Sequence, residues 1–159
     1  MTAAPSSIAQ RLAQAGITLP KAAAPAANYV PYVQSGHLLH ISGQIPFRAD
    51  GTLVTGRLGA DMDVATGQAA ARLCAIGIMA QAEAALGTLE RVARVVKLGV
   101  FVNAVADFTD QPKVANGASD LMVEIFGEAG RHARSAVGVP CLPLGVAVEI
   151  DAVLEVLPR

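Results

Sequence analysis

The spacing of apolar positions along the chain predicts two long helices. Between Val64 and Leu86, apolar residues recur every three or four positions, and Gly87 follows as a typical helix end. A second helix is expected to begin at Thr109 or Asp110, because either side chain can cap it. The apolar stripe of this second helix consists of Val114, Ala118, Leu121 and Ile125. Each helix therefore has one face that must be buried.

Five other apolar runs have the composition of β-strands. Tyr29–Gln34 and Leu38–Ile45 flank Ser35-Gly36, a dipeptide that is typical of hairpin turns. The other three runs are rich in valine and cover Arg91–Val102, Ser135–Val139 and Val146–Val156. With the helices, the order is strand, strand, helix, strand, helix, strand, strand. We therefore expect an α+β fold in which two helices pack on one face of a mixed β-sheet.

A short helix and a connector precede this domain. Ser7 to Ala15 has an apolar face and a serine cap, and Gly16 can end the helix. Pro20 to Ala27 is rich in Ala and Pro, so it is expected to be extended. We therefore divide the chain into an N-terminal segment, residues 1–28, and a main domain, residues 29–159.

The last predicted strand has one uniformly apolar side and one acidic side. Because side chains alternate along a strand, one face carries Ala147, Glu149, Asp151, Val153 and Glu155. The other face is expected to pack on the helices and carries Val146, Val148, Ile150, Ala152 and Leu154. Glu149 should therefore point away from the helices.

Composition disfavours some classes of function and favours an assembly. Apolar residues make up 53% of the chain, charged residues only 16%, and the formal net charge is −1. This charge provides no attractive field for nucleic acid or an anionic membrane. So few charges would leave apolar surface exposed on a monomer, so we expect an oligomer. The sequence shows no signal-like or membrane-spanning run, which makes the cytoplasm the default compartment.

Two charged residues lie in the C-terminal apolar runs, where a charge is costly unless it has a partner. Arg134 precedes the first run and Glu149 lies near the middle of the second. One interpretation is a structural ion pair or a solvent-exposed side of the sheet. The other is an arginine that binds a carboxylate beside a glutamate that moves protons. His132 either borders this site or lies in a surface loop.

Three motifs, in a fixed order, support the second interpretation. The first runs from Pro31-Tyr-Val-Gln-Ser-Gly into Ile41-Ser-Gly-Gln-Ile-Pro46. The second is Val96–Val102 with Asp107-Phe108. The third is Arg-Ser-x-Val-x-Val-x-x-Leu-Pro from Arg134, followed by Val-Glu-Ile-x-Ala. Through these motifs, the stretch from Pro31 to Val156 resembles the RidA (YjgF) family of imine/enamine deaminases.

This resemblance implies a chorismate-mutase-like fold and a homotrimer with active sites in the clefts between subunits. The implied reaction is hydrolysis of reactive 2-imino acids, or their enamine tautomers, to 2-keto acids and ammonia. No cofactor and no metal are implied. Arg134 would hold the carboxylate of the substrate, and Glu149 would activate the attacking water.

The resemblance also implies roles for four other residues. The backbone N–H of Gly43 and the backbone at Ala136 would fix the imine end of the substrate, and Tyr32 and Asn116 would line the pocket. Deaminases of the family commonly carry Cys two residues after the Arg, where this chain has Ala136. This difference alters the shape of the pocket.

Other functions stay open at this stage. The same Arg134 pocket could serve a non-catalytic metabolite-binding or regulatory trimer, and a protein-interaction module could keep only the fold. Some family members carry the label endoribonuclease, but a slightly acidic chain with few aromatics lacks the features of RNA-binding proteins. His37 and His40 would lie on opposite faces of a strand, which disfavours a metal site. Cys74 and Cys141 form no metal or redox motif, and Cys74 is expected to be a core thiol.

Overall fold

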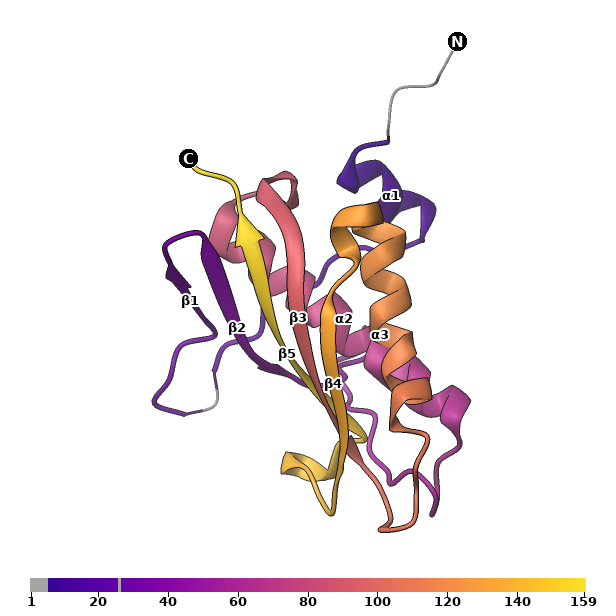
Figure 1. Ribbon diagram of the computed structural model, residues 1–159. Helices are drawn as coiled ribbons and strands as arrows, with labels where there is room; N and C mark the ends of the chain where they lie inside the picture. The colour runs from indigo at the N-terminus through magenta and orange to yellow at the C-terminus, as the bar shows by residue number, and fades with distance from the viewer. Residues whose placement is uncertain (1–5, 26) are drawn as a thin grey trace.

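The computed structural model describes residues 6–25 and 27–159, which form one sheet with helices on one side (Figure 1). Residues 1–5 and 26, part of the predicted N-terminal segment, lie outside the described residues. The helices are α1 (Ile8–Gln14), α2 (Val64–Leu86) and α3 (Gln111–Phe126). The strands are β1 (Tyr32–Ser35), β2 (Leu38–Gln44), β3 (Val92–Asn103), β4 (Ala133–Val139) and β5 (Val148–Val156). Short 3-10 turns cover Leu89–Arg91, Gly127–Gly130 and Pro143–Gly145.

The strands form one mixed sheet in the order β1-β2-β5-β3-β4. β3 and β4 run parallel because α3 carries the chain back between them, and the other pairs are antiparallel. α2 and α3 pack against each other and cover the same face of the sheet (Figure 1). Within the described residues, no helix covers the opposite face, which we call the open face. The predicted α+β fold, with two helices on one face of a mixed sheet, is confirmed.

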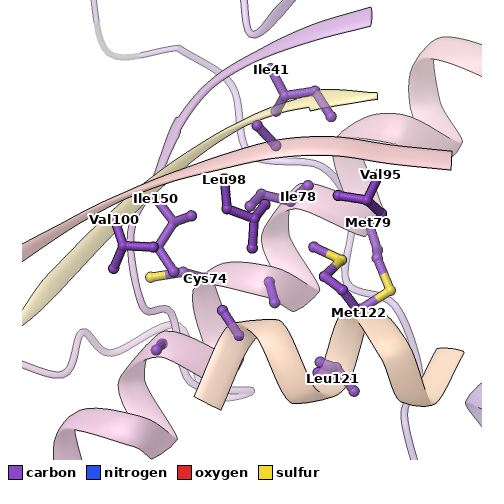
Figure 2. Close-up of a cluster of buried hydrophobic side chains, with 14 of the residues drawn as sticks. Ile41, Cys74, Ile78, Met79, Val95, Leu98, Val100, Leu121, Met122 and Ile150 are labelled. Carbon is purple, nitrogen blue, oxygen red and sulfur yellow. The ribbon is translucent and has the colours of Figure 1, made fainter. Parts of the chain in front are cut away.

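The core lies between the sheet and the two long helices (Figure 2). The apolar stripe predicted for α3 is completely buried in it. Cys74 of α2 also lies in this core, and its thiol donates to the carbonyl oxygen of Val148 at 3.6 Å. Burial raises the pKa of this thiol well above its ordinary value. Cys74 is therefore a core thiol, as predicted.

The ends of the long helices follow from their capping residues. α2 begins after Asp63, whose side chain accepts a hydrogen bond from the N–H of Thr66 at 2.8 Å. It ends at Gly87, which adopts a left-handed conformation with φ of 82°. α3 begins after Asp110 as predicted, but the Asp110 side chain does not cap it. Asp110 instead pairs with Lys113 at 3.1 Å.

Two predicted strands begin later in the structure than in the sequence analysis. β1 begins at Tyr32 rather than Tyr29, because Pro31 has no N–H with which to join the ladder. β5 begins after Ala147, whose N–H donates to the carbonyl oxygen of Val54 at 3.0 Å. Ala147 is therefore buried against a loop and does not belong to the exposed acidic face that was predicted for it.

By length and composition, α2 is apolar enough to cross a membrane, since an 18-residue window of it has a mean hydropathy of 1.3. The expectation that no run of the chain is long and apolar enough to span a membrane is therefore wrong. In the fold, 56% of that window is buried, and α2 contacts β2, β5 and α3. The apolar character of α2 is accounted for by the core of the domain.

Candidate functional site

Arg134 lies near the start of β4, where the sheet meets α3. Its Nη1 donates to Asn116 Oδ1 at 2.9 Å and to Ser119 Oγ at 3.0 Å, and its Nη2 donates to the carbonyl oxygen of Pro112 at 3.3 Å. Asn116 and Ser119 are three residues apart on α3, so they lie on the same side of the helix. The structure thus brings Arg134 and Asn116, two of the predicted site residues, into direct contact.

The guanidinium of Arg134 keeps donors for a ligand. A guanidinium has five N–H donors in a planar fork, and contacts with α3 use three of them. Arg134 has no acidic partner within the described ranges, whose ion pairs are Arg72–Glu124, Lys113–Asp110 and Arg131–Glu128. The Nε donor and one Nη2 donor therefore have no partner in the described part of the chain. Two such donors match the geometry of a carboxylate.

Glu149 lies in β5, directly beside a glycine of β2. The β2–β5 pairing is irregular between Ile41 and Gln44, and Gly43 lies in this bulge. A Cβ on Gly43 would overlap the carboxylate of Glu149. Burial and, to a smaller extent, the charge of Asp151 raise the pKa of Glu149 above its ordinary value. The structure thus brings Gly43 and Glu149 together.

Arg134 and Glu149 point to opposite faces of the sheet. Arg134 pairs with Leu98 of β3, and Glu149 pairs with Phe101 of the same strand. Paired residues share a face, and residues an odd number of positions apart lie on opposite faces. Leu98 is fully buried on the helix side, so Arg134 lies on that side and Glu149 lies on the open face. The register therefore excludes an ion pair between Arg134 and Glu149 within one chain, and a site that uses both residues stays a prediction for two chains.

The other two predicted site residues lie on different edges of the sheet. Ala136 follows Arg134 by two positions on β4, shares its face and packs partly on the core. Tyr32 lies on β1, at the opposite edge of the sheet from β4. Because neighbouring strands are separated by about 4.8 Å, Tyr32 and Arg134 are roughly 19 Å apart across the sheet. One chain therefore does not place all the predicted residues around one pocket.

Ser119 and His132 join Arg134 in a polar cluster that is larger than the predicted site. His132 Nδ1 lies 2.6 Å from the carbonyl oxygen of Gly130, and its Nε2 lies 2.9 Å from Ser119 Oγ. His132 is half-buried, so it borders the candidate site and is not a free loop residue. Ser119 was absent from the predicted set, although its three-residue spacing from Asn116 on a helix is a signal for it. We call Arg134, Asn116, Ser119 and His132 the Arg134 cluster.

Two clefts of the described structure lie away from these residues. One cleft of about 350 Å³ is lined by Ala93, Arg94, Glu128, Ala129 and Glu155. The other, of about 260 Å³, includes Arg57, Gln111 and Gly138 in its lining. Neither cleft is lined by Arg134 or Glu149. Among residues 6–25 and 27–159, no group of three or more His, Cys, Asp or Glu side chains could hold a metal ion.

Gly43→Ala is expected to lower the free energy of unfolding by about 0.5–1.5 kcal/mol, the usual cost of moving a side chain such as Glu149 off its preferred rotamer. The reason is that the new methyl group overlaps the Glu149 carboxylate. Urea unfolding followed by circular dichroism measures this loss. The double variant Gly43→Ala/Glu149→Ala should recover most of it, because the second change removes the overlapped atoms. The same loss in both variants would contradict the role of this contact.

Sequence and fold both match one known family. The family model described as "YjgF/chorismate mutase-like, putative endoribonuclease" matches residues 9–155. Protein TCP17 of Trypanosoma cruzi is 59% identical over 149 residues, which cover 93% of each chain. The crystal structure of Atu1372, a protein of unknown function from Agrobacterium tumefaciens, is 50% identical with a TM-score of 0.87 over 94% of both chains. TdcF of E. coli, solved with bound serine, is 27% identical with a TM-score of 0.62 over 87% of this chain and 94% of that one. The predicted resemblance is confirmed, and the chain belongs to the YjgF/chorismate-mutase-like family.

Proposed function

We propose that this protein hydrolyses small 2-imino acids, or their enamine tautomers, to 2-keto acids and ammonia. The observation that carries the proposal is the guanidinium of Arg134, which three hydrogen bonds hold in place while two donors keep no partner in the described chain. Such a fork binds a carboxylate through two parallel hydrogen bonds. The serine bound to TdcF also carries a carboxylate next to a carbon–nitrogen bond, which supports this class of ligand.

The proposed chemistry needs orientation, water and proton transfer, because an imine next to a carboxylate is already electrophilic. Glu149 takes a proton from water as the oxygen attacks the C=N carbon, and it passes this proton to the nitrogen to give a carbinolamine. It then moves the hydroxyl proton to the amino group, which leaves as ammonia while the C=O bond forms. The raised pKa of Glu149 favours such exchange of protons. In this scheme the backbone at Gly43 and Ala136 fixes the imine end, and neither a cofactor nor a metal is required.

The opposite orientations of Arg134 and Glu149 support a pocket that two chains share. We therefore propose a homotrimer in which Arg134 of one subunit faces Glu149 of the next. Apolar side chains on the open face support a second copy as its cover, since Val33, Leu38 and Val137 are 52%, 39% and 46% exposed. A sedimentation mass of one or two protomers at micromolar concentration would contradict this assembly.

Coexpression of two inactive variants tests the shared pocket. Arg134→Ala and Glu149→Gln subunits, produced in equal amounts, should together regain about a quarter of the wild-type imine hydrolysis. In random trimers, about one pocket in four combines an intact Arg134 from one kind of subunit with an intact Glu149 from the other. Each variant expressed alone is the control for background activity. Mixed trimers without recovered activity would contradict a pocket that Arg134 of one subunit and Glu149 of the next share.

The second candidate function is that of a non-catalytic metabolite-binding or regulatory trimer with the same Arg134 pocket. Ala136, which replaces the family's usual Cys, favours this second function. A coupled assay separates the two functions. An amino acid oxidase generates 2-imino acids, and their disappearance is followed with and without this protein. Faster disappearance supports the hydrolase, whereas an unchanged rate together with 2-keto acid binding supports the binding protein.

A further inference from the structure

Arg134 and three other polar groups form a continuous hydrogen-bonded row. The carbonyl oxygen of Gly130 contacts His132 Nδ1 at 2.6 Å, and His132 Nε2 contacts Ser119 Oγ at 2.9 Å. Ser119 Oγ in turn accepts a hydrogen bond from Arg134 Nη1 at 3.0 Å. The row starts in the turn after α3, returns to α3 and ends on β4. It therefore ties the guanidinium to two separate segments of the chain.

When the His132 ring is neutral, the carbonyl group at one end determines the direction of every hydrogen bond in the row. A carbonyl oxygen only accepts, so Nδ1 of His132 carries the hydrogen, and Nε2 of the neutral ring is an acceptor. The hydroxyl of Ser119 then donates to Nε2, and its oxygen accepts from Arg134. Hydrogen bonds that follow one another in this way polarise and strengthen each other.

Packing holds the start of the row in place. Gly130 is buried, and a Cβ on it would overlap the backbone carbonyl of Met122 in α3. The backbone here approaches the helix as closely as a glycine permits, which restricts movement of the Gly130 carbonyl. At the other end, Asn116 accepts the second hydrogen of Arg134 Nη1 at 2.9 Å. With both Nη1 hydrogens engaged, the plane of the rigid guanidinium has a single orientation.

We propose that Ser119 and His132 are positioning residues that hold the guanidinium of Arg134 in the orientation that binds a carboxylate. This inference rests on the proposed function, because it concerns the same ligand. Arginine has a flexible side chain, and ordering it before the ligand arrives reduces the entropy lost on binding. In this role Ser119 and His132 act through Arg134 and do not bind the carboxylate themselves. Removing either one should therefore weaken the binding of all small 2-keto acids to a similar degree.

Calorimetry with pyruvate and the full-length protein tests the positioning role. Ser119→Ala and His132→Leu should each raise the Kd by about 5- to 20-fold, as expected for members of one hydrogen-bond network. Both changes interrupt the same row. The Kd of the double variant should therefore be no higher than the higher of the two single-variant Kd values. Ser119→Thr keeps the hydroxyl and should bind like the wild type. His37→Leu changes an exposed residue in the turn between β1 and β2 and serves as the matched control.

The tautomer of His132 gives a readout that does not depend on a variant being folded. Long-range proton–nitrogen correlation spectra of the wild type should show a protonated Nδ1 and an unprotonated Nε2 for the neutral ring. A protonated Nε2 would overturn the direction of the row. Folded single variants with unchanged Kd, or losses that add in the double variant, would overturn the positioning role. A wild type that binds no 2-keto acid would overturn the proposed function, while the tautomer would still decide whether the row exists.

Discussion

Arg134→Ala is expected to weaken the binding of small 2-keto acids by roughly 2–5 kcal/mol, the range for truncating one partner of a desolvated charge pair. The variant loses the charge-assisted fork that binds the carboxylate. It also removes the donor from three acceptors, which are Asn116 Oδ1, Ser119 Oγ and the carbonyl oxygen of Pro112. Calorimetry with a panel of 2-keto acids measures the loss.

Two other arginine variants make this experiment specific. Arg134→Lys keeps the positive charge without the planar fork, so its affinity should lie between those of the wild type and Arg134→Ala. Arg72 is a partly exposed arginine of α2 that pairs with Glu124 at 3.3 Å. Such a pair contributes at most about 1 kcal/mol to stability, so Arg72→Ala should bind 2-keto acids like the wild type. Equal affinities of wild type and Arg134→Ala would contradict the proposed carboxylate site.

Glu149→Gln should leave 2-keto acid binding nearly intact and slow imine hydrolysis by roughly 10²–10⁴-fold, the usual range for general acid–base catalysis. Glutamine keeps the size of the side chain but cannot take a proton from water. Glu155→Gln is the matched control, because Glu155 is an exposed acid on the same face of β5, and it should retain turnover. Unchanged turnover in a folded Glu149→Gln protein would refute the catalytic role and favour the metabolite-binding function.

Stability as a function of pH gives a second readout for the same variant. Burial raises the pKa of Glu149 in the folded chain above its value in the unfolded chain. The protonated side chain therefore contributes to stability, and this contribution is complete below the unfolded-state pKa. This contribution is lost as the pH rises through the folded-state pKa. Glu149→Gln should therefore be at least as stable as the wild type at neutral pH, and the two should converge in acid. If Glu149→Gln were less stable than the wild type at neutral pH, this would instead indicate that Glu149 forms an ion pair.

Local sequence was sufficient to predict the helices and the two sides of β5. α2 has the predicted bounds because Asp63 and Gly87 cap it, and both caps act on residues close in the chain. The alternation of apolar and acidic residues placed Glu149 on the open face, since neighbouring side chains of a strand always point to opposite sides. Local sequence could not predict the hydrogen bond between Arg134 and Asn116, because it joins residues on two different elements.

The sequence by itself determined which residues lie on which side of their own helix or strand. Only the tertiary structure decided that Arg134 and Glu149 point away from each other, because this depends on how β4 and β5 each pair with β3. A shift of one residue in either pairing would have placed both side chains on one face. Ser119 and His132 likewise meet only because α3 packs back over β4. Register and packing join residues distant in sequence, and for that reason they decided the composition of the candidate site.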